Sequence, residues 1–224
     1  LYSLSGMSLN SVDNSIFANN MLSLDNLNTN AIAYNQYGIY LQSGSNNKIV
    51  YNNVYSRSLN QSTKRTHGFA LGTPTLISES NIVKNNIIVS EGYGYAISYR
   101  PSTVIETNKY DFDFSNNFYY KKNTGSNQNL ALFSYNGSNT TDTSDWKTQT
   151  KDTISSFNED PLFDSWGDEL FTTCINLCAK GTTIEGVTHD YYNKERPSEP
   201  EKKPCIGARE FDPPLNNIYV FETG

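Results

Sequence analysis

The sequence is short of the aliphatic side chains that fill most soluble cores. Only 36% of its 224 residues are hydrophobic even with tyrosine counted, so it does not suit a helical bundle built from alanine, leucine, glutamate and lysine. No apolar run approaches the roughly 18 residues that a membrane-spanning helix needs, and no charged-then-apolar leader opens the chain. Because the chain starts at Leu1 rather than at methionine, we expect a processed or partial product. Aromatic residues make up 13% of the chain, which is enough to bury a core, so full disorder is not expected.

Basic clusters are also missing. Residues 1–140 hold 9 lysines and arginines against 7 acidic residues, whereas residues 141–224 hold 8 against 16. The net charge of −6 therefore comes from the last third of the chain. Without a basic face, the chain is not expected to bind nucleic acid or to anchor on anionic lipid.

Cysteine and histidine are too few to predict a metal site. The three cysteines are Cys174, Cys178 and Cys205, and with His189 they make only a weak zinc pattern. They leave open three thiols, or one free thiol with a Cys174–Cys205 or Cys178–Cys205 disulfide. Turns rich in Asp and Asn could hold Ca²⁺, but no run has the ligand spacing of a calcium loop. We therefore expect no metal and no cofactor.

Asparagine is the residue in excess, with 29 copies. A phrase of apolar residues around an Asn-Asn pair recurs four times, and its second asparagine falls at Asn20, Asn53, Asn86 and Asn117, with spacings of 33, 33 and 31 residues. A second apolar phrase alternates with it, at 37–41, 67–71, 94–98 and 129–133. Self-similarity at this period is typical of a solenoid. The period is too short for WD-type propeller blades, and the leucine framework of leucine-rich repeats is missing.

Each repeat predicts short strands that stack on the next repeat. The apolar pieces are three to five residues long, rich in β-branched and aromatic side chains, and interrupted by Asn, Gly or Ser. A unit of this size cannot bury its own apolar face, so units must stack in parallel. The expected strands are 39–41, 49–51, 54–55, 69–71, 82–84, 87–89, 95–98, 112–114, 118–120 and 130–133. We interpret Asn20, Asn53, Asn86 and Asn117 as an amide ladder on one line along the axis.

Segments near the end of the chain carry a family resemblance. They are Phe114–Tyr120, then Trp146, Asp152, Ser155 and Asp160-Pro161-Leu162-Phe163, then Cys174-Ile175-Asn176, Asp190, Arg196-Pro197 and Ile206–Phe211. Together with the repeat, they resemble the last rungs and closing tail of the right-handed parallel β-helix proteins of the pectate-lyase-like superfamily. The sequence departs from that pattern at Cys205, where Asp is usual, and at Arg209, where an aromatic residue is usual.

The resemblance implies an all-β fold, a right-handed parallel β-helix solenoid of about four rungs. Rungs would occupy residues 1–140, and residues 141–224 would form a capping region packed on the same solenoid. We expect the end of the stack to be covered by an apolar set from the tail, namely Leu162, Phe163, Ile175, Ile206 and Phe211. Residues 1–15 contain no amphipathic capping helix, so we expect a longer chain or a larger surface complex to cover the N-terminal end.

Ligand contacts are expected on outward positions of the second phrase. The positions taken as inward are Ile39, Phe69, Tyr95 and Leu130. Strand alternation then sends outward Tyr40, Ala70, Ala96 and Ala131, and also Gln42, Gly72, Ser98 and Phe133. A strip of small residues walled by loops suits an extended polysaccharide, although it also suits a surface with no ligand.

Five residues near this strip are candidates for catalysis: Lys64, Arg65, His67, Tyr99 and Arg100. Polysaccharide lyases of this superfamily pair a basic residue with cations that neutralise a uronate carboxylate, so the resemblance implies these roles. Because arginine stays protonated, the proton acceptor would be Lys64, His67 or Tyr99. The candidate glycan-binding residues are Tyr40, Arg65, His67, Tyr99 and Arg100. The alternative is that Lys64 and Arg65 are solvated and that His67 is framework.

Glycoside hydrolysis would need two carboxylates roughly 5–10 Å apart. Asp111 and Asp113 could share a strand face, with Glu91 or Glu106 from neighbouring turns. The ordinary alternative is that these are polar residues of loops and strand edges.

Two classes of function remain. The first is a secreted or cell-surface protein of bacterial type that binds or processes polysaccharide, as a lyase or glycoside hydrolase if it is an enzyme. The second is a non-catalytic structural or adhesive component of a cell-envelope assembly. A phage tail-spike segment ranks below both, because such proteins rarely carry the Ile-Gly-Ala-x-Glu-Phe ending. The expected partner is a glycan.

Overall fold

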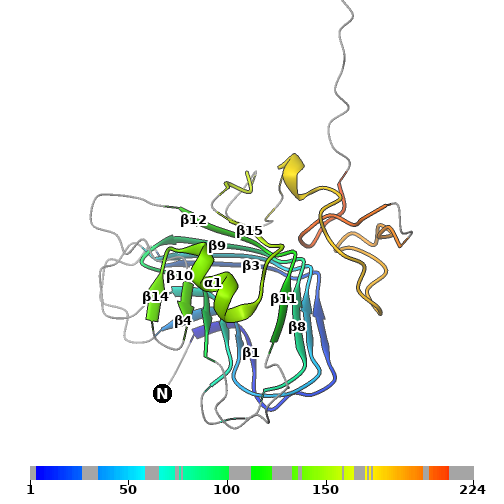
Figure 1. The fold of residues 1–224 in the computed structure, drawn as a ribbon. Helices are drawn as coiled ribbons and strands as arrows, with labels where there is room; N and C mark the ends of the chain where they lie inside the picture. Colours follow the sequence, from blue (N-terminus) through cyan, green and yellow to red (C-terminus); the bar gives the residue numbers. More distant parts are fainter. Residues whose placement is uncertain are drawn as a thin grey trace, which may run out of the picture.

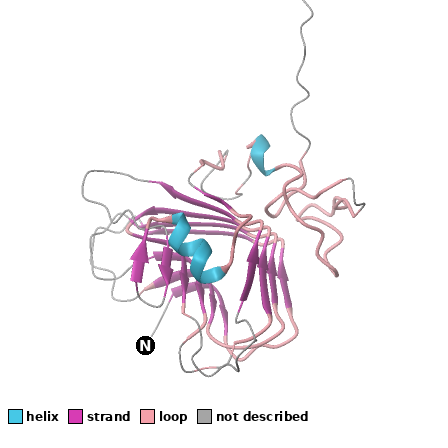
Figure 2. Ribbon diagram, in the orientation of Figure 1, coloured by secondary structure: helices cyan, strands magenta, loops and turns pink. Residues whose placement is uncertain are grey.

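The structure is a computed structural model. It describes residues 4–26, 35–58, 66–73, 76, 78–100, 112–122, 133–135, 138–157, 159–163, 170, 172, 174–198 and 202–211. Figure 2 shows that regular structure in these residues is almost entirely β-strand, with one α-helix, α1 (Thr143–Thr150), and one 3-10 turn, η1 (Ile175–Leu177). Among the described residues, no helix has the length and apolar character needed to cross a membrane.

Three sheets form the walls of the fold. Sheet A contains β1 (Leu4–Leu9), β4 (Gln36–Leu41), β7 (Thr66–Leu71), β10 (Gly94–Tyr99), β13 (Phe133–Tyr135) and β14 (Ser138–Thr140). Sheet B contains β2 (Ile16–Ala18), β5 (Lys48–Val50), β8 (Asn81–Lys84) and β11 (Phe112–Ser115). Sheet C contains β3 (Met21–Asn26), β6 (Asn53–Ser58), β9 (Ile87–Gly92), β12 (Phe118–Lys122) and β15 (Ser156–Phe157).

The chain visits these sheets in a repeating order. From β2 to β13 it passes through sheets B, C and A in turn, and every pairing is parallel except that of β13 with β14. In Figure 1 the three sheets surround a common interior, with successive strands of each sheet stacked on one another. The parallel stacking predicted from the repeat is confirmed, and the structure is compatible with a parallel β-helix or solenoid.

The interior is filled by short columns of apolar side chains. One column runs through Ile39, Phe69 and Ile97, and a second runs through Val54, Ile88 and Tyr119. Gly68 lies beside these columns, where an added Cβ would sit 2.5 Å from the Ala96 carbonyl oxygen and 2.5 Å from Ile88. A residue without a side chain is therefore required there so that neighbouring turns can approach.

The asparagine ladder exists, but one predicted member is wrong. Asn20 Nδ2 donates to Asn52 Oδ1 at 2.8 Å, Asn52 Nδ2 to Asn86 Oδ1 at 2.9 Å, and Asn86 Nδ2 to Asn117 Oδ1 at 2.9 Å. Asn52 therefore occupies the position predicted for Asn53. Asn53 lies one place along, opposite Met21 and Ile87.

The shift follows from the backbone at this corner. The residue before each ladder asparagine is left-handed: φ is 60° at Asn19, 56° at Tyr51, 59° at Asn85 and 53° at Asn116. In the second turn a tyrosine takes this conformation, so the Asn-Asn pair of the sequence begins one residue later. The sequence period counted Asn-Asn pairs, whereas the fold aligns the left-handed residues.

A second ladder at the corner before sheet B was not predicted. Asn47 Oδ1 accepts from the Ser15 amide at 3.1 Å, and Asn81 Oδ1 accepts from Asn47 Nδ2 at 3.0 Å. Both asparagines are fully buried. They satisfy backbone groups that the turn between sheets A and B leaves without a strand partner.

Helix α1 places one large side chain over the last strands. Trp146 is 1% exposed, and its ring stacks on Phe133 with centroids 4.5 Å apart and an interplanar angle of 12°. It meets Phe114 and Tyr119 edge-on. Asp142 caps the helix by accepting from the Ser144 amide at 2.7 Å. In Figure 1, α1 crosses in front of the sheets at this end.

The tail was predicted to cover the end of the stack, whereas the apolar tail residues that the structure describes pack along its flank. Phe163 and Ile206 are buried as expected, yet they pack on outward residues of sheet C, namely Tyr55, Ile87, Val89 and Phe118. Leu162 is 53% exposed, and Phe211 is half-buried. Ile175 lies in η1, and its side chain is outside the described residues. The tail packs on this flank because sheet C carries apolar side chains on its outer face, and the tail buries them from water.

A buried ion pair fastens this tail. Arg196 is paired with Glu210, and its Nη2 donates to Asn19 Oδ1 at 2.8 Å and to the Gly207 carbonyl oxygen at 3.0 Å. Its guanidinium lies 3.8 Å from the centroid of the Tyr51 ring. The tail thus bonds directly to the corner where the left-handed residues stack.

Candidate functional site

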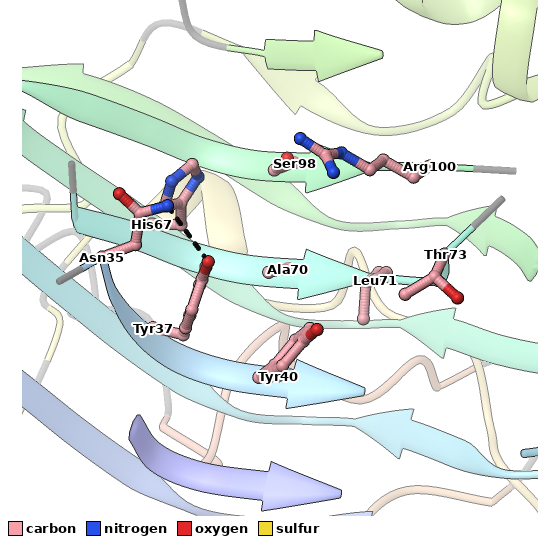
Figure 3. A pocket seen from close by; sticks show the side chains of 10 residues that line it. Asn35, Tyr37, Tyr40, His67, Ala70, Leu71, Thr73, Ser98 and Arg100 are labelled. Atoms are coloured by element: carbon pink, nitrogen blue, oxygen red, sulfur yellow. Dashed lines mark hydrogen bonds between the residues drawn. The ribbon is translucent and has the colours of Figure 1, made fainter. Parts of the chain in front are cut away.

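A shallow hollow of about 150 Å³ opens on the outer face of sheet A (Figure 3). It is lined by Asn35, Tyr37, Tyr40, His67, Ala70, Leu71, Gly72, Thr73, Ser98 and Arg100. These residues come from β4, β7 and β10 and from the positions just outside these strands. The hollow is smaller than the roughly 300–1,000 Å³ of drug-sized ligand pockets, so it suits one unit of an extended ligand.

Strand register explains which side chains meet there. Tyr37 pairs with His67, and His67 with Tyr95. Three residues further along, Tyr40 pairs with Ala70, and Ala70 with Ser98. Two columns of side chains therefore run side by side across the three strands.

The predicted Ala70–Ala96–Ala131 strip is wrong at Ala96. That residue is fully buried in the core, and Ser98 takes the outward place beside Ala70. Ala131 and Leu130 lie outside the described residues. The sequence matched Tyr95 with Ile39, but in the structure Tyr95 is level with Tyr37 and Ile97 is level with Ile39. The register of this strand therefore differs by two residues from the predicted one.

Two other predicted orientations are also wrong. Phe133, expected outward, is fully buried and pairs with Ile97. Tyr95, expected in the core, instead pairs with His67 in the outer column, with ring centroids 5.2 Å apart. Gln42 is half-buried, and Gly72 and Ser98 line the hollow.

Aromatic rings form one side of the hollow. The Tyr37 and Tyr40 rings stack with centroids 4.8 Å apart and an interplanar angle of 23°. Tyr37 also stacks on His67 at 5.2 Å, and His67 is 7% exposed. Asn35 Nδ2 donates to the Tyr37 hydroxyl at 3.2 Å, the bond drawn in Figure 3. The rings are thus held in place before any ligand arrives.

A glycine turn brings the polar side of the hollow together. Gly72 has φ +73°, and a Cβ there would lie 2.4 Å from the Arg100 carbonyl oxygen. Any other residue would be strained and would push the two turns apart. Glycine therefore allows Thr73, after β7, to lie on the same rim as Arg100, after β10.

The Tyr40 hydroxyl can donate a hydrogen bond at neutral pH, as an ordinary tyrosine does. Partial burial raises its pKa, Tyr37 adds to the increase, and the positive charge of Arg100 opposes it. The raised pKa extends the protonated state further into alkaline solution. Arg100 itself is exposed, so its guanidinium faces solvent beside the tyrosine.

Of the predicted site residues, three line this hollow: Tyr40, His67 and Arg100. Tyr99 does not, because it lies in the core against Phe112 and Phe114. Lys64 and Arg65 lie outside the described residues. Asn35, Tyr37 and Thr73 also line the hollow, but the sequence did not point to them as site residues. Each lies at or just beyond the end of a strand, near a residue that was selected.

Of the candidate hydrolase carboxylates, the two that the structure describes, Asp113 and Glu91, lie on different sheets. Asp113 lies on sheet B and pairs with Lys84 at 2.6 Å. Glu91 lies on sheet C, where it meets Arg57 at 3.5 Å and accepts from the Tyr55 hydroxyl at 2.6 Å. Asp111 and Glu106 lie outside the described residues.

The part of the chain that is described contains no cluster of three or more His, Cys, Asp or Glu side chains suited to a metal. Cys174, Cys178, Cys205 and His189, the residues of the weak zinc pattern, therefore do not form such a cluster. Cys174, Cys178 and Cys205 are all free thiols. The hollow offers instead ring faces, hydroxyls, an amide and a guanidinium, a set suited to binding the C–H faces and hydroxyls of a sugar.

Comparison with known proteins adds no relative. No family, curated protein or solved structure matches this chain at a significant level.

Proposed function

We propose that this chain binds a polysaccharide across the outer face of sheet A, with one sugar unit in the hollow. The observation that carries the proposal is the stacked Tyr37–Tyr40 pair beside Arg100. Aromatic faces attract the C–H groups of sugar rings, and arginine donates paired hydrogen bonds to hydroxyls or carboxylates.

The proposal includes the finer fold and the location suggested by the sequence. The chain would be a right-handed parallel β-helix of the pectate-lyase-like kind, closed at one end by α1, and it would act outside the cell or on its surface. Parallel stacking and the asparagine ladder support the fold.

Binding is tested with a glycan array followed by calorimetry on the best glycan. Tyr40→Ala removes one ring of the stack, and we expect binding at least tenfold weaker, equivalent to about 1.4 kcal/mol. Arg100→Ala should weaken binding to uronate-containing polymers more than to neutral ones, because the guanidinium pairs best with a carboxylate.

Matched controls come from the tail. Tyr191 and Lys180 are exposed and do not line the hollow, so Tyr191→Ala and Lys180→Ala should leave binding unchanged. Failure of the wild-type protein to bind any glycan would overturn the proposal. If Tyr40→Ala and Tyr191→Ala lost equal amounts of glycan affinity, the hollow would not be the binding site. Release of unsaturated uronate product, followed by ultraviolet absorbance, would add lyase activity.

A structural or adhesive role is the second candidate, and one observation favours it. The first strands, β1, β2 and β3, are each outermost in their sheets. Edge strands of this kind can pair with another chain. Concentration-dependent assembly together with no glycan binding would favour this role over the first.

A further inference from the structure

Two of the three cysteines lie in tail segments that backbone hydrogen bonds hold side by side. The Ile206 amide donates to the Leu177 carbonyl oxygen at 2.8 Å, and the Gly181 amide donates to that of Pro204 at 2.8 Å. Cys178 follows Leu177, and Cys205 precedes Ile206. Each cysteine is therefore next to a residue that is bonded to the other segment.

Their side chains also turn to the same place. Cys178 Sγ and Cys205 Sγ each lie 3.3 Å from the carbonyl oxygen of Phe211. The two sulfurs cannot be farther apart than twice that distance. Cys174 points elsewhere, with its Sγ 3.9 Å from Glu159 Oε1. The geometry thus separates two pairings that the sequence alone could not distinguish.

We propose that Cys178 and Cys205 are a disulfide-forming pair, oxidised by a low-molecular-weight disulfide such as glutathione disulfide. Cys178 is half-buried and Cys205 is 2% exposed, so the oxidant reaches Cys178 first. The Cys178 thiolate attacks the oxidant, forms a mixed disulfide and releases one small thiolate. Cys205 then loses its proton and attacks the Cys178 sulfur, which releases the second small thiol.

In the complete reaction, two protein thiols become one protein disulfide, and one glutathione disulfide becomes two glutathione thiols. Burial raises the pKa of the Cys205 thiol. The second step is therefore expected to be slower than the first and faster at higher pH.

The bond would close a loop that covers the outside of the solenoid. Within that loop, Ile184 and Val187 pack on Val50 and Tyr51. A disulfide across a loop of this length restricts the unfolded chain, and for a protein of this size we expect Tm to rise by roughly 5–10 °C.

The test uses the full chain, reduced and then incubated with glutathione disulfide at mildly alkaline pH. Free thiols should fall from three to one, without retained glutathione. Cleavage after Leu177 separates Cys174 from Cys178, so peptide mapping identifies the partners directly. Tm is measured on the same two samples.

Variants keep the result independent of folding defects. Cys174→Ser should still lose two thiols and gain Tm, whereas Cys178→Ser should do neither. A bond that maps to Cys174, or three thiols that persist in the folded oxidised sample, would overturn the proposal. Neither result depends on glycan binding.

Discussion

At the scale of single residues, the buried asparagines carry the turns of the solenoid. Asn86 Nδ2 donates to the Ile49 carbonyl oxygen at 2.9 Å, and its Oδ1 accepts from the Asn52 amide at 3.0 Å. A ladder of asparagines could be predicted from the period alone. Its membership in the second turn could not, because Tyr51 adopts the left-handed conformation that asparagine and glycine usually take.

Tyr51 tolerates that conformation because its side chain is well held. Its hydroxyl donates to the Thr182 carbonyl oxygen at 2.6 Å, and Arg196 lies over its ring. Asn53, displaced from the ladder, instead binds the tail through the Leu170 carbonyl oxygen and the Ala208 amide. These contacts link residues more than 100 positions apart, and no local pattern indicates them.

Asn86→Ala should destabilise the protein strongly. The change leaves the Asn52 amide and the Ile49 carbonyl group buried without their partners, and each such group costs roughly 1–3 kcal/mol. We expect the free energy of unfolding, measured in urea, to fall by about 2–5 kcal/mol.

Asn176→Ala is the matched control for this measurement. Asn176 is exposed, and its side chain donates to Glu159 Oε1, so its replacement should cost less than about 1 kcal/mol. Similar losses in the two variants would mean that the buried ladder is not a special source of stability.

At the scale of elements, strand positions were predictable and strand register was less so. Nearly all expected strands are present, because short β-branched and aromatic runs between Asn, Gly and Ser are a strong local signal. The register of β10 differs by two residues from that suggested by its letters, since Tyr95-Ala96-Ile97 aligns with Tyr37-Gly38-Ile39. Ala96 fills the place of a glycine, which hid the match. The predicted outward strip therefore takes Ala96 from β10, whereas Ser98 is the residue that pairs with Ala70 on the outer face.

Helix α1 was not predicted, although Trp146 is one of the residues on which the family resemblance rests. The helix is short and mostly polar, and Trp146 is its buried side chain. Its indole also lies 3.4 Å from Asp152 Oδ2, which accepts from it. Burial raises the pKa of Asp152, despite hydrogen bonds from Ser155 and Trp146 that lower it.

Trp146→Ala tests what this helix contributes. Removing a fully buried indole from a cluster of three rings leaves a large cavity, and such changes typically cost about 3–5 kcal/mol. We expect a loss of that size in chemical denaturation. Gln149→Ala, at an exposed position of the same helix, should change stability by less than about 0.5 kcal/mol. If the tryptophan variant were as stable as the glutamine variant, α1 would not secure this end of the stack.

At the scale of the whole molecule, the tail and the sheets share their apolar surfaces. Ile184 and Val187 cover the corner after sheet B, while Phe163, Leu177 and Ile206 cover sheet C. The apolar residues of the tail were predicted to cover the end of the stack. Their packing on sheet C could not be predicted, because outward and inward apolar residues alternate within the same short strands. Both kinds give the same strand signal in the sequence.

Arg196→Ala should release the tail before the sheets. The change leaves Glu210 buried without its partner, which typically costs about 3–5 kcal/mol. In hydrogen exchange we expect the Tyr191 and Asp190 amides to exchange at least about 100-fold faster, since each 1.4 kcal/mol is tenfold. Amides in β7 and β9 should keep their protection.

Arg209→Ala is the control, because Arg209 is exposed and lies 5.7 Å from the Tyr192 ring. It should leave exchange in the tail nearly unchanged. A uniform rise across tail and sheets in Arg196→Ala would show instead that both unfold as one cooperative unit.

The contact between Asn19 and Arg196 has a consequence for the order of events during synthesis. Successive turns bond across about one repeat, as Asn52 and Asn86 do at a separation of 34 residues, so each turn can dock soon after the next has been made. Asn19 and Arg196 are 177 residues apart, and their bond must wait until the segment that carries Arg196 has emerged. Throughout that interval Tyr55, Ile87 and Val89 lack their cover from the tail. The newly made chain therefore passes through a stage in which an apolar flank is exposed to its neighbours, and a chaperone that shields this flank would act on it then.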